Sequence, residues 1–332
     1  MKMIFIYILL LAFSISLEAS NEDKNNWEFE RFSFYFEDDV YTKTDEGYSA
    51  GERLSYLFNI SNEDYLIYDA LFMDFGQTSS YFSFAITNQI FTPTDTNATE
   101  LIEDDRPYAG WTYLEWAIHK SSKTHLRSLS LQIGMVGKAS YAEEIQNSVH
   151  NIIGSDPVNG WHNQLSNELG VNLKYTHKWM LDLADRGGFE AHLIPFVSGE
   201  LGNIATNLTT GASARFGYNI PKDFGVSSID IGADPGIPVH GELENMKKQS
   251  WSFSLNLLGG GSAVARDIFL DGNTFVDSHS VDKENFIYYY GFGFTMRYEN
   301  FIFDFMEISN SKKFKEQPKS HGVGTLIISW LF

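Results

Sequence analysis

The sequence predicts an all-β protein, a twelve-stranded antiparallel transmembrane β-barrel with a short helix on the extracellular side. Three observations favour this class. The last strand places Leu326, Ile328, Trp330 and the terminal Phe332 at alternate positions, as in the closing strands of bacterial outer-membrane barrels. Tyr, Phe and Trp make up 15% of the chain, which suits the aromatic girdles of a lipid-facing barrel. Apolar residues also alternate with polar or small ones over segments long enough to cross a bilayer at a tilt.

The first residues of the chain have the pattern of a secretory signal. Lys2 precedes an almost wholly apolar run at Ile4–Phe13, and small residues follow it. This run is shorter than the ~20 residues that a membrane-spanning helix needs. We therefore assign 1–19 to a signal peptide and 20–332 to an outer-membrane β-barrel, with the cell outer membrane as its location.

The composition excludes several kinds of function. The chain has no cysteine, so disulfides, thiolate metal sites and cysteine nucleophiles are excluded. Its formal net charge of −19 argues against nucleic acid as a partner. Divalent cations, or a surface loaded with them, suit such a chain better.

Period-2 alternation defines the strands, for example over 251–257 and 288–298. A soluble sandwich shows the same alternation, so the length of the strands, which reaches the ~9–11 residues of a membrane-crossing strand, is the stronger signal. The number of expected strands is even, as in single-chain bacterial barrels. Closing the sheet removes the exposed strand edges, whose backbone groups lipid cannot hydrogen-bond. The expected strands are 30–39, 48–59, 80–91, 108–121, 126–139, 169–180, 188–199, 206–218, 249–264, 284–299, 300–312 and 320–332.

The connections between these strands differ in length. We expect the tight turn at Glu299–Asn300 on the periplasmic side. Segment 66–75 is ambiguous and could extend a strand. Several of the long polar segments should be extracellular loops, namely 60–79, 92–107, 140–168, 219–248 and 265–283.

One segment, 142–153, reads as a short helix. Gln146 and His150 are four residues apart, so they share one face of it. A second face is apolar and could pack on the barrel rim, and Gly154 is placed to end the helix. Taken alone, a histidine in such a place is most often an ordinary surface residue.

Three adjacent carboxylates, Glu37, Asp38 and Asp39, end the first strand. Such a cluster is usually a solvated turn or protects a sheet edge. Its functional interpretation is a calcium site, because hard cations take oxygen ligands. Neighbouring strand residues point to opposite faces, so the three cannot bind one ion without a bulge or loop.

These pieces resemble the motifs of the outer-membrane lipid A deacylase family, enzymes that remove the 3′-acyloxyacyl chain from lipopolysaccharide. The order and spacing hold from about residue 30 to 170. The matching motifs are Glu-Asp-Asp at 37–39, Tyr-Ser-Ala-Gly at 48–51, Asp-Arg-Pro-Tyr-Ala-Gly at 105–110, Gln-x-x-x-His at 146–150 with Ile-Gly at 153–154, and Gly-Trp…Gln…Asn-Glu at 160–168.

The resemblance implies a calcium-dependent esterase whose site lies near the extracellular leaflet and whose substrate is the lipid A part of lipopolysaccharide. His150 would be the general base on a water molecule, with Gln146 and Ser49 in the catalytic group and Ser49 as an orienting hydroxyl. The Ca²⁺ ligands would include Asp38, Asp39 and Asp156. Outer-membrane lipids would surround the protein, which we expect to be a monomer.

The chain departs from the family pattern at several positions. Asp38 stands where Asn is usual, Ser49 where Thr is usual, and Asp156 where the best-known relative has Glu. The 94–99 loop carries no Lys or Arg where that relative has basic residues. Arg53 and Arg106 are possible substitutes.

Two alternative functions remain open on the residues. An outer-membrane phospholipase or protease could use a similar barrel, and His119-Lys120-Ser121 comes nearest to a phospholipase pattern. A porin or adhesin would be non-enzymatic, would show no clustered Asp with His, and would need no calcium.

Overall fold

The computed structural model describes residues 27–39, 47–60, 76–154, 158–229, 231 and 235–332. The expected signal peptide at 1–19 and the ambiguous segment 66–75 lie outside these residues. Within the described ranges, no helix combines the length and apolar character needed to cross a membrane.

Strands make up most of the described chain, and each begins and ends at the following residues: β1 (Trp27–Asp38), β2 (Gly47–Ile60), β3 (Ser79–Thr92), β4 (Ala109–Ser121), β5 (His125–Val136), β6 (Glu168–Trp179), β7 (Leu181–Arg186), β8 (Phe189–Gly202), β9 (Ala205–Tyr218), β10 (Trp251–Asp267), β11 (Phe286–Tyr298), β12 (Phe301–Asn310) and β13 (His321–Leu331). Short helices interrupt the connections: η2 (Gly137–Ser140), α3 (Ala142–Ile153), η3 (Trp161–Asn163), α4 (Leu243–Lys248) and α5 (Ile268–Asp271).

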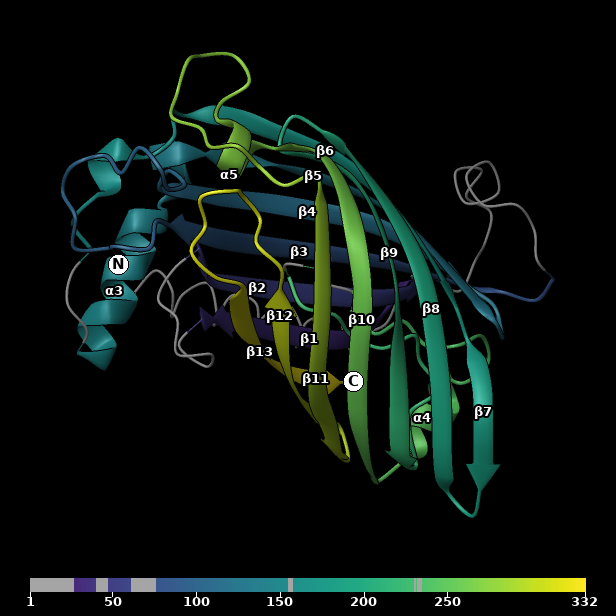
Figure 1. Ribbon diagram of the computed structural model, residues 1–332. Coiled ribbons are helices and arrows are strands. Elements are labelled where there is room, and N and C mark those ends of the chain that lie inside the picture. The colour runs from purple at the N-terminus through teal and green to yellow at the C-terminus, as the bar shows by residue number, and fades with distance from the viewer. Residues whose placement is uncertain (1–26, 40–46, 61–75, 155–157, 230, 232–234) are drawn as a thin grey trace.

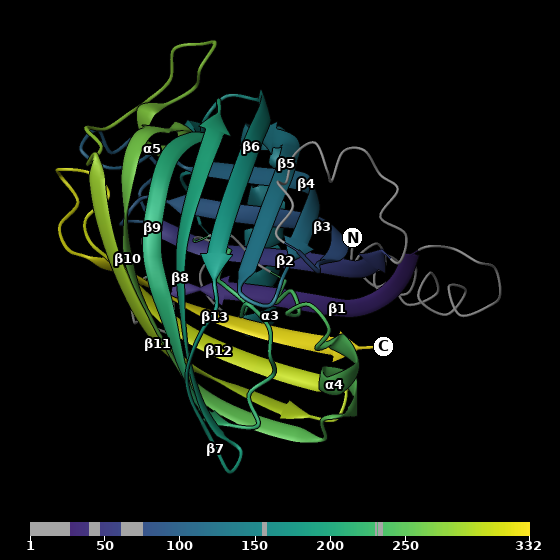
Figure 2. The ribbon, with the colours of Figure 1, turned by 90° about the vertical axis from the view of Figure 1, so that its right-hand side faces the viewer.

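The strands of the described residues form one antiparallel sheet that closes into a barrel (Figures 1 and 2). Sequential neighbours pair, β1 pairs with β13, and the barrel closes through β6 and β8. Twelve strands therefore form the wall, and β7 is an additional strand paired only with β8. Closure satisfies the backbone groups that an open edge would expose to lipid.

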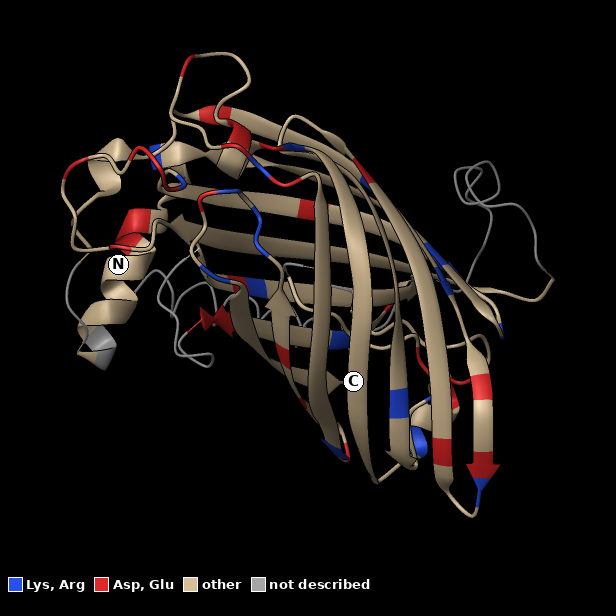
Figure 3. Cartoon of the chain, in the orientation of Figure 1, with Lys and Arg blue, Asp and Glu red and all other residues tan. Residues whose placement is uncertain are grey.

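Side chains alternate between the lumen and the outside along each strand. In β11, Tyr288, Tyr290 and Phe292 are exposed on the outer face, whereas Ile287 and Tyr289 are buried inside. Figure 3 shows that the middle of β10 and β11 carries no charged residue. This pattern fits a wall that is surrounded by hydrocarbon.

The two ends of the barrel carry different structures. One end carries the start of β1, the end of β13, α4 and the turn at Glu299 and Asn300 (Figure 1), and we call it the terminal end. The opposite end carries α3 and α5, and we call it the α3 end. The connection between β9 and β10 belongs to the terminal end, so 219–248 is not a loop of the end that carries α3.

Part of that connection enters the barrel. We call its described residues 219–229, 231 and 235–239 the lumen segment. Phe224 and Ile237 pack in the same cluster as the inward-facing Leu57 and Tyr81, and Ile231 reaches the larger cluster at the α3 end. The apolar residues of this segment therefore fill the barrel interior.

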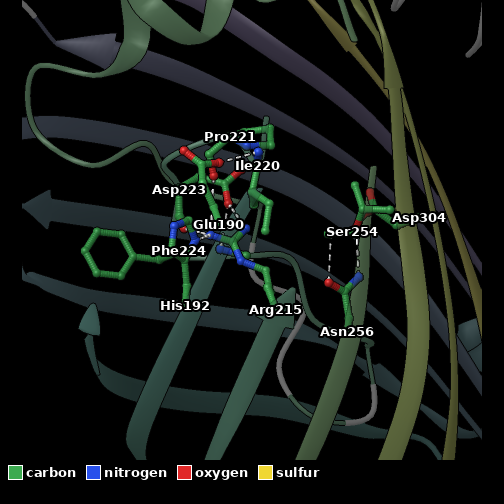
Figure 4. A network of polar contacts seen from close by, with 12 residues as sticks. Glu190, His192, Arg215, Ile220, Pro221, Asp223, Phe224, Ser254, Asn256 and Asp304 are labelled. Carbon is green, nitrogen blue, oxygen red and sulfur yellow. Dashed lines mark hydrogen bonds and ion pairs between the residues drawn. The ribbon is translucent and has the colours of Figure 1, made fainter. Parts of the chain in front are cut away.

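Polar contacts hold the lumen segment in place (Figure 4). Arg215 of β9 donates to an Asp223 carboxylate oxygen at 2.5 Å. Arg31 of β1 donates to the carbonyl of Pro235 at 2.8 Å, and Lys178 donates to that of Phe224 at 3.2 Å. All three cationic side chains face inward and are largely buried, so each replaces lost hydration with a protein partner.

The short helix α5 closes the lumen at the α3 end. Ile268, Phe269 and Leu270 are buried, and the Phe269 ring stacks on Phe91 of β3 with centroids 3.9 Å apart. A cavity of about 170 Å³ lies between α5 and the lumen segment, and Trp111 is among the residues that line it.

Each of the twelve expected strands is present, with boundaries within three residues of those expected. The largest differences are that β1 begins at Trp27 rather than 30, β5 ends at Val136 rather than 139, β8 ends at Gly202 rather than 199 and β10 ends at Asp267 rather than 264, and β7 was not predicted. At the end of β5, Gly137 takes a left-handed conformation (φ 81°) that diverts the chain into η2. In β7 every residue is exposed, so its side chains give no alternation between two environments.

Candidate functional site

The α3 helix forms as the sequence predicts. It runs from Ala142 to Ile153, and Gly154 ends it in a left-handed conformation with φ 81°. The N–H of Gly154 donates to the carbonyl of His150 at 2.8 Å. This C-terminal glycine satisfies a carbonyl that the helix itself leaves unpaired.

The helix packs at the rim of the α3 end, as expected, against the outer face of the wall. Its Ala142 and Ile145 pack with Ile90 of β3 and Ala50 of β2. Gly110 of β4 makes this close approach possible, since a Cβ there would lie 2.1 Å from the Cβ of Ala142. The glycine of the Asp-Arg-Pro-Tyr-Ala-Gly motif thus leaves room for the start of α3 to pack on β4.

Gln146 lies in the interface between α3 and the following loop. It is 4% exposed, and its amide oxygen accepts a hydrogen bond of 2.9 Å from the indole N–H of Trp161. His150 lies one turn further along the same face and is half-buried. The helix therefore presents the two predicted catalytic side chains together.

The carboxylate cluster divides between the two sides of the wall, as the alternation predicts. Glu37 is fully buried on the lumen side. It accepts hydrogen bonds from Tyr48, Thr325 and the backbone N–H of Ile229, at 2.6–2.8 Å. Asp38 is half-buried, lies on the outer face and pairs in register with Ala50, whereas Asp39 follows the strand and is 1% exposed.

Ser49 lies at an irregularity of β2, where the register with β3 shifts between Tyr48 and Ala50. Its hydroxyl is 4% exposed and lies 2.6 Å from the Thr92 hydroxyl of β3. Within the described chain, Ser49 is thus held by another hydroxyl rather than by an imidazole. This arrangement suits an orienting hydroxyl better than a nucleophile.

The predicted metal ligands are described only in part. Asp156 lies outside the described residues. Among those described, no three His, Cys, Asp or Glu side chains lie together closely enough to hold a metal. The described residues of the predicted site, Asp38, Asp39, Ser49 and Gln146, carry carboxylate, hydroxyl and amide oxygens, which is the donor chemistry that Ca²⁺ takes.

Two residues of the outer face were missed by sequence reasoning. Glu52 of β2 and Asn88 of β3 are directly opposite one another in register. The signal was present in the sequence, because Glu52 stands in an outward-facing row with Leu54 and Tyr56. A carboxylate is out of place in such a row unless it has a partner.

The two arginines considered as substitutes for a basic loop residue lie on the other side of the wall. Arg53 faces the lumen and donates to a carboxylate oxygen of Glu115 at 2.6 Å. The Arg106 guanidinium lies 4.8 Å from the centre of the inward-facing Phe91 ring. Neither guanidinium shares the outer face with α3, so neither takes that role in this structure.

The histidine considered for a phospholipase also faces the lumen. His119 is 2% exposed and lies between the hydroxyls of Ser83 and Ser128, at 2.9 Å and 2.8 Å. A lipid in the surrounding membrane cannot reach it.

The wall is closed, its outer surface faces lipid, and α3 covers a polar site on the outside of the wall. These features define an outer-membrane β-barrel protein. The family model described as "Outer membrane protein LpxR" matches residues 4–332. The chain therefore belongs to the LpxR family of outer-membrane proteins.

One solved structure supports the same fold. LpxR from Salmonella typhimurium superimposes with a TM-score of 0.73 at 19% identity, covering 91% of this chain and 100% of that one. The β domain of the Bordetella autotransporter BrkA covers 92% of this chain and 99% of its own at 7% identity, with a TM-score of only 0.47. Comparison with the curated proteins gives no match.

Proposed function

We propose that this protein is an outer-membrane hydrolase that removes the 3′-acyloxyacyl chain from the lipid A of lipopolysaccharide. One observation supports this most directly: α3, the helix that carries Gln146 and His150, packs through Ala142 and Ile145 on the outer face of the barrel wall. A site on that wall is open to lipid, whereas a site in the filled lumen is not.

In the proposed reaction, His150 is the general base that takes a proton from the attacking water. Gln146 is held by Trp161 and so keeps the helix face that carries His150 in a fixed orientation. Ser49 orients a polar group through its hydroxyl, supported by Thr92.

We further propose that Asp38, Asp39 and Asp156 hold Ca²⁺ at this site. A bound Ca²⁺ would polarise the ester carbonyl and stabilise the negative charge that develops on its oxygen. We expect the α3 end to face the extracellular leaflet, where the acyl chains of lipid A lie, and the protein to act as a monomer among outer-membrane lipids.

The test is mass spectrometry of lipid A from cells that express the wild type or His150→Asn, with added calcium or with chelator. We expect the wild type to cause a calcium-dependent mass loss equal to one acyloxyacyl group. The variant should insert and migrate as a heat-modifiable barrel but leave lipid A unchanged, because Asn cannot accept the proton. Deacylation by the variant would exclude His150 as the base.

A phospholipase is the runner-up, and it can be tested in the same cells. If phospholipids rather than lipid A lose acyl chains, the proposed substrate is wrong.

A further inference from the structure

A pair of oxygen atoms on the outer face has no partner in the described structure. Oε2 of Glu52 and Oδ1 of Asn88 are both buried, and neither accepts a hydrogen bond from the residues described. Asn88 as a whole is only 7% exposed. Two buried acceptors side by side, one of them on a carboxylate, destabilise the fold unless a hydrogen-bond donor or a cation lies between them.

The orientation of the Asn88 amide follows from its neighbours. Its Nδ2 donates to the Thr112 hydroxyl at 2.6 Å, and that hydroxyl donates its own proton to the carbonyl of Ser140 at 2.6 Å. Since Thr112 has no proton left to give, it needs a donor from Asn88. The amide nitrogen therefore faces Thr112, and Oδ1 is the atom that remains without a partner.

Glu52 and Asn88 also lie close to the candidate site. They form a direct cross-strand pair, for which Cβ atoms are about 4.5–5.5 Å apart. Asp38 pairs with Ala50, two positions from Glu52 on the same outer face, and its charge acts on that of Glu52. Two carboxylates at diagonal positions of neighbouring strands repel each other unless a cation lies between them.

We propose that Glu52 and Asn88 are additional ligands, with Asp38, of the divalent cation at this site. The three side chains offer two carboxylates and one amide oxygen, which is an oxygen set of the kind that Ca²⁺ takes. This inference rests on the proposed function for the presence of calcium, and it adds two residues that the family motifs do not include.

Cation binding to the full chain, folded in detergent micelles, tests the proposal without any measurement of activity. Ca²⁺ is titrated by calorimetry, and Tb³⁺ is titrated by the luminescence that nearby aromatic side chains sensitise. We expect Glu52→Gln to weaken binding by roughly tenfold or more, since it removes one ligand charge. Asn88→Ala should weaken it in the same direction. Glu28→Gln, which changes an exposed carboxylate at the terminal end, is the matched control and should bind as the wild type does.

A specific alternative to the proposal can be tested with the same variant. A protonated Glu52 could donate to Oδ1 of Asn88 without any cation, and Gln at position 52 would preserve that hydrogen bond. Unchanged Ca²⁺ and Tb³⁺ affinity in Glu52→Gln, with a folded barrel, would show this alternative to be correct. A wild type that binds neither ion would also overturn the inference.

The outcome is separable from that of the proposed function. If Glu52→Gln binds calcium normally while His150→Asn abolishes deacylation, the added ligands are wrong and the enzyme assignment stands. If Glu52→Gln loses the cation while wild-type cells show unchanged lipid A, the cation site stands and the enzyme assignment is wrong.

Discussion

Glu37 joins three distant parts of the chain through one buried carboxylate. Tyr48 of β2, Thr325 of β13 and the N–H of Ile229 in the lumen segment all donate to it. It lies next to Asp38 but on the opposite side of the wall. Glu37 is thus positioned to fix the end of β1 from inside, while Asp38 faces the candidate site outside.

At this residue the structure predicts a measurable loss of stability. Glu37→Gln replaces one accepting oxygen with an amide group, so at least one buried donor loses its acceptor. We expect the free energy of unfolding to fall by about 1–3 kcal/mol. Guanidinium unfolding followed by tryptophan fluorescence measures this, with Glu28→Gln as the exposed control. Equal midpoints for both variants would contradict the role assigned to Glu37.

Sequence reasoning could predict part of this cluster. Strand alternation correctly indicates that Glu37, Asp38 and Asp39 cannot all face one ion. It could not predict the partners of Glu37, because Ile229 and Thr325 are 192 and 288 residues away in sequence. Glu52 could have been found from its place in an outward-facing apolar row, but its neighbour Asn88 lies on the next strand and is set by the register.

At the scale of elements, the docking of α3 on the wall depends on the absence of a side chain at Gly110. An added Cβ would lie 2.1 Å from the Cβ of Ala142 and 2.3 Å from the Ser140 hydroxyl oxygen. Contacts this short require the start of the helix to move away from β4.

The corresponding prediction concerns activity rather than folding. In Gly110→Ala the barrel should form, but the displaced α3 should slow lipid A deacylation by on the order of 100-fold, since such displacements misplace the base. Gly259→Ala is a suitable control, because a Cβ there meets nothing within 4 Å. Equal deacylation rates for the two variants, measured by mass spectrometry, would show that α3 need not sit tightly on β4.

Elements with a periodic pattern were predictable, and those without one were not. The strands and α3 follow their expected ranges because each has an apolar face at a fixed spacing. The α5 helix is one turn long and lies in a segment expected as a loop. Its buried residues, Ile268, Phe269 and Leu270, are adjacent, so they show no periodicity from which a helix could be read.

At the scale of the whole molecule, the lumen is occupied from both ends. The lumen segment fills it from the terminal end, and α5 covers it at the α3 end. Sequence reasoning could place 219–248 between two strands but not inside the barrel. The buried contacts of that segment come from strands that are far apart in the chain, such as β1, β3 and β9.

A filled lumen predicts electrical behaviour unlike that of a porin. The wild type should give no steady conductance in planar bilayers. A variant in which a Gly-Ser linker replaces 222–239, and in which Ile268, Phe269 and Leu270 are changed to Ser, should conduct because both closures are gone. Conductance of the wild type at the level of this variant would favour the porin interpretation.

The seam between β6 and β8 has a consequence for how the barrel comes apart and is put together. These strands pair only along Asn172–Lys178, because the beginning of β8 pairs with β7 instead. The junction between the first and last strands is nearly as short, since β1 and β13 pair only along Arg31–Asp38, whereas the other junctions of the wall are longer. Two halves, one from β1 to β6 and one from β8 to β13, therefore meet along the two shortest lines of pairing in the wall. Heat or denaturant should separate the cylinder along these lines first, and during biogenesis they are the natural places for the last hydrogen bonds to form.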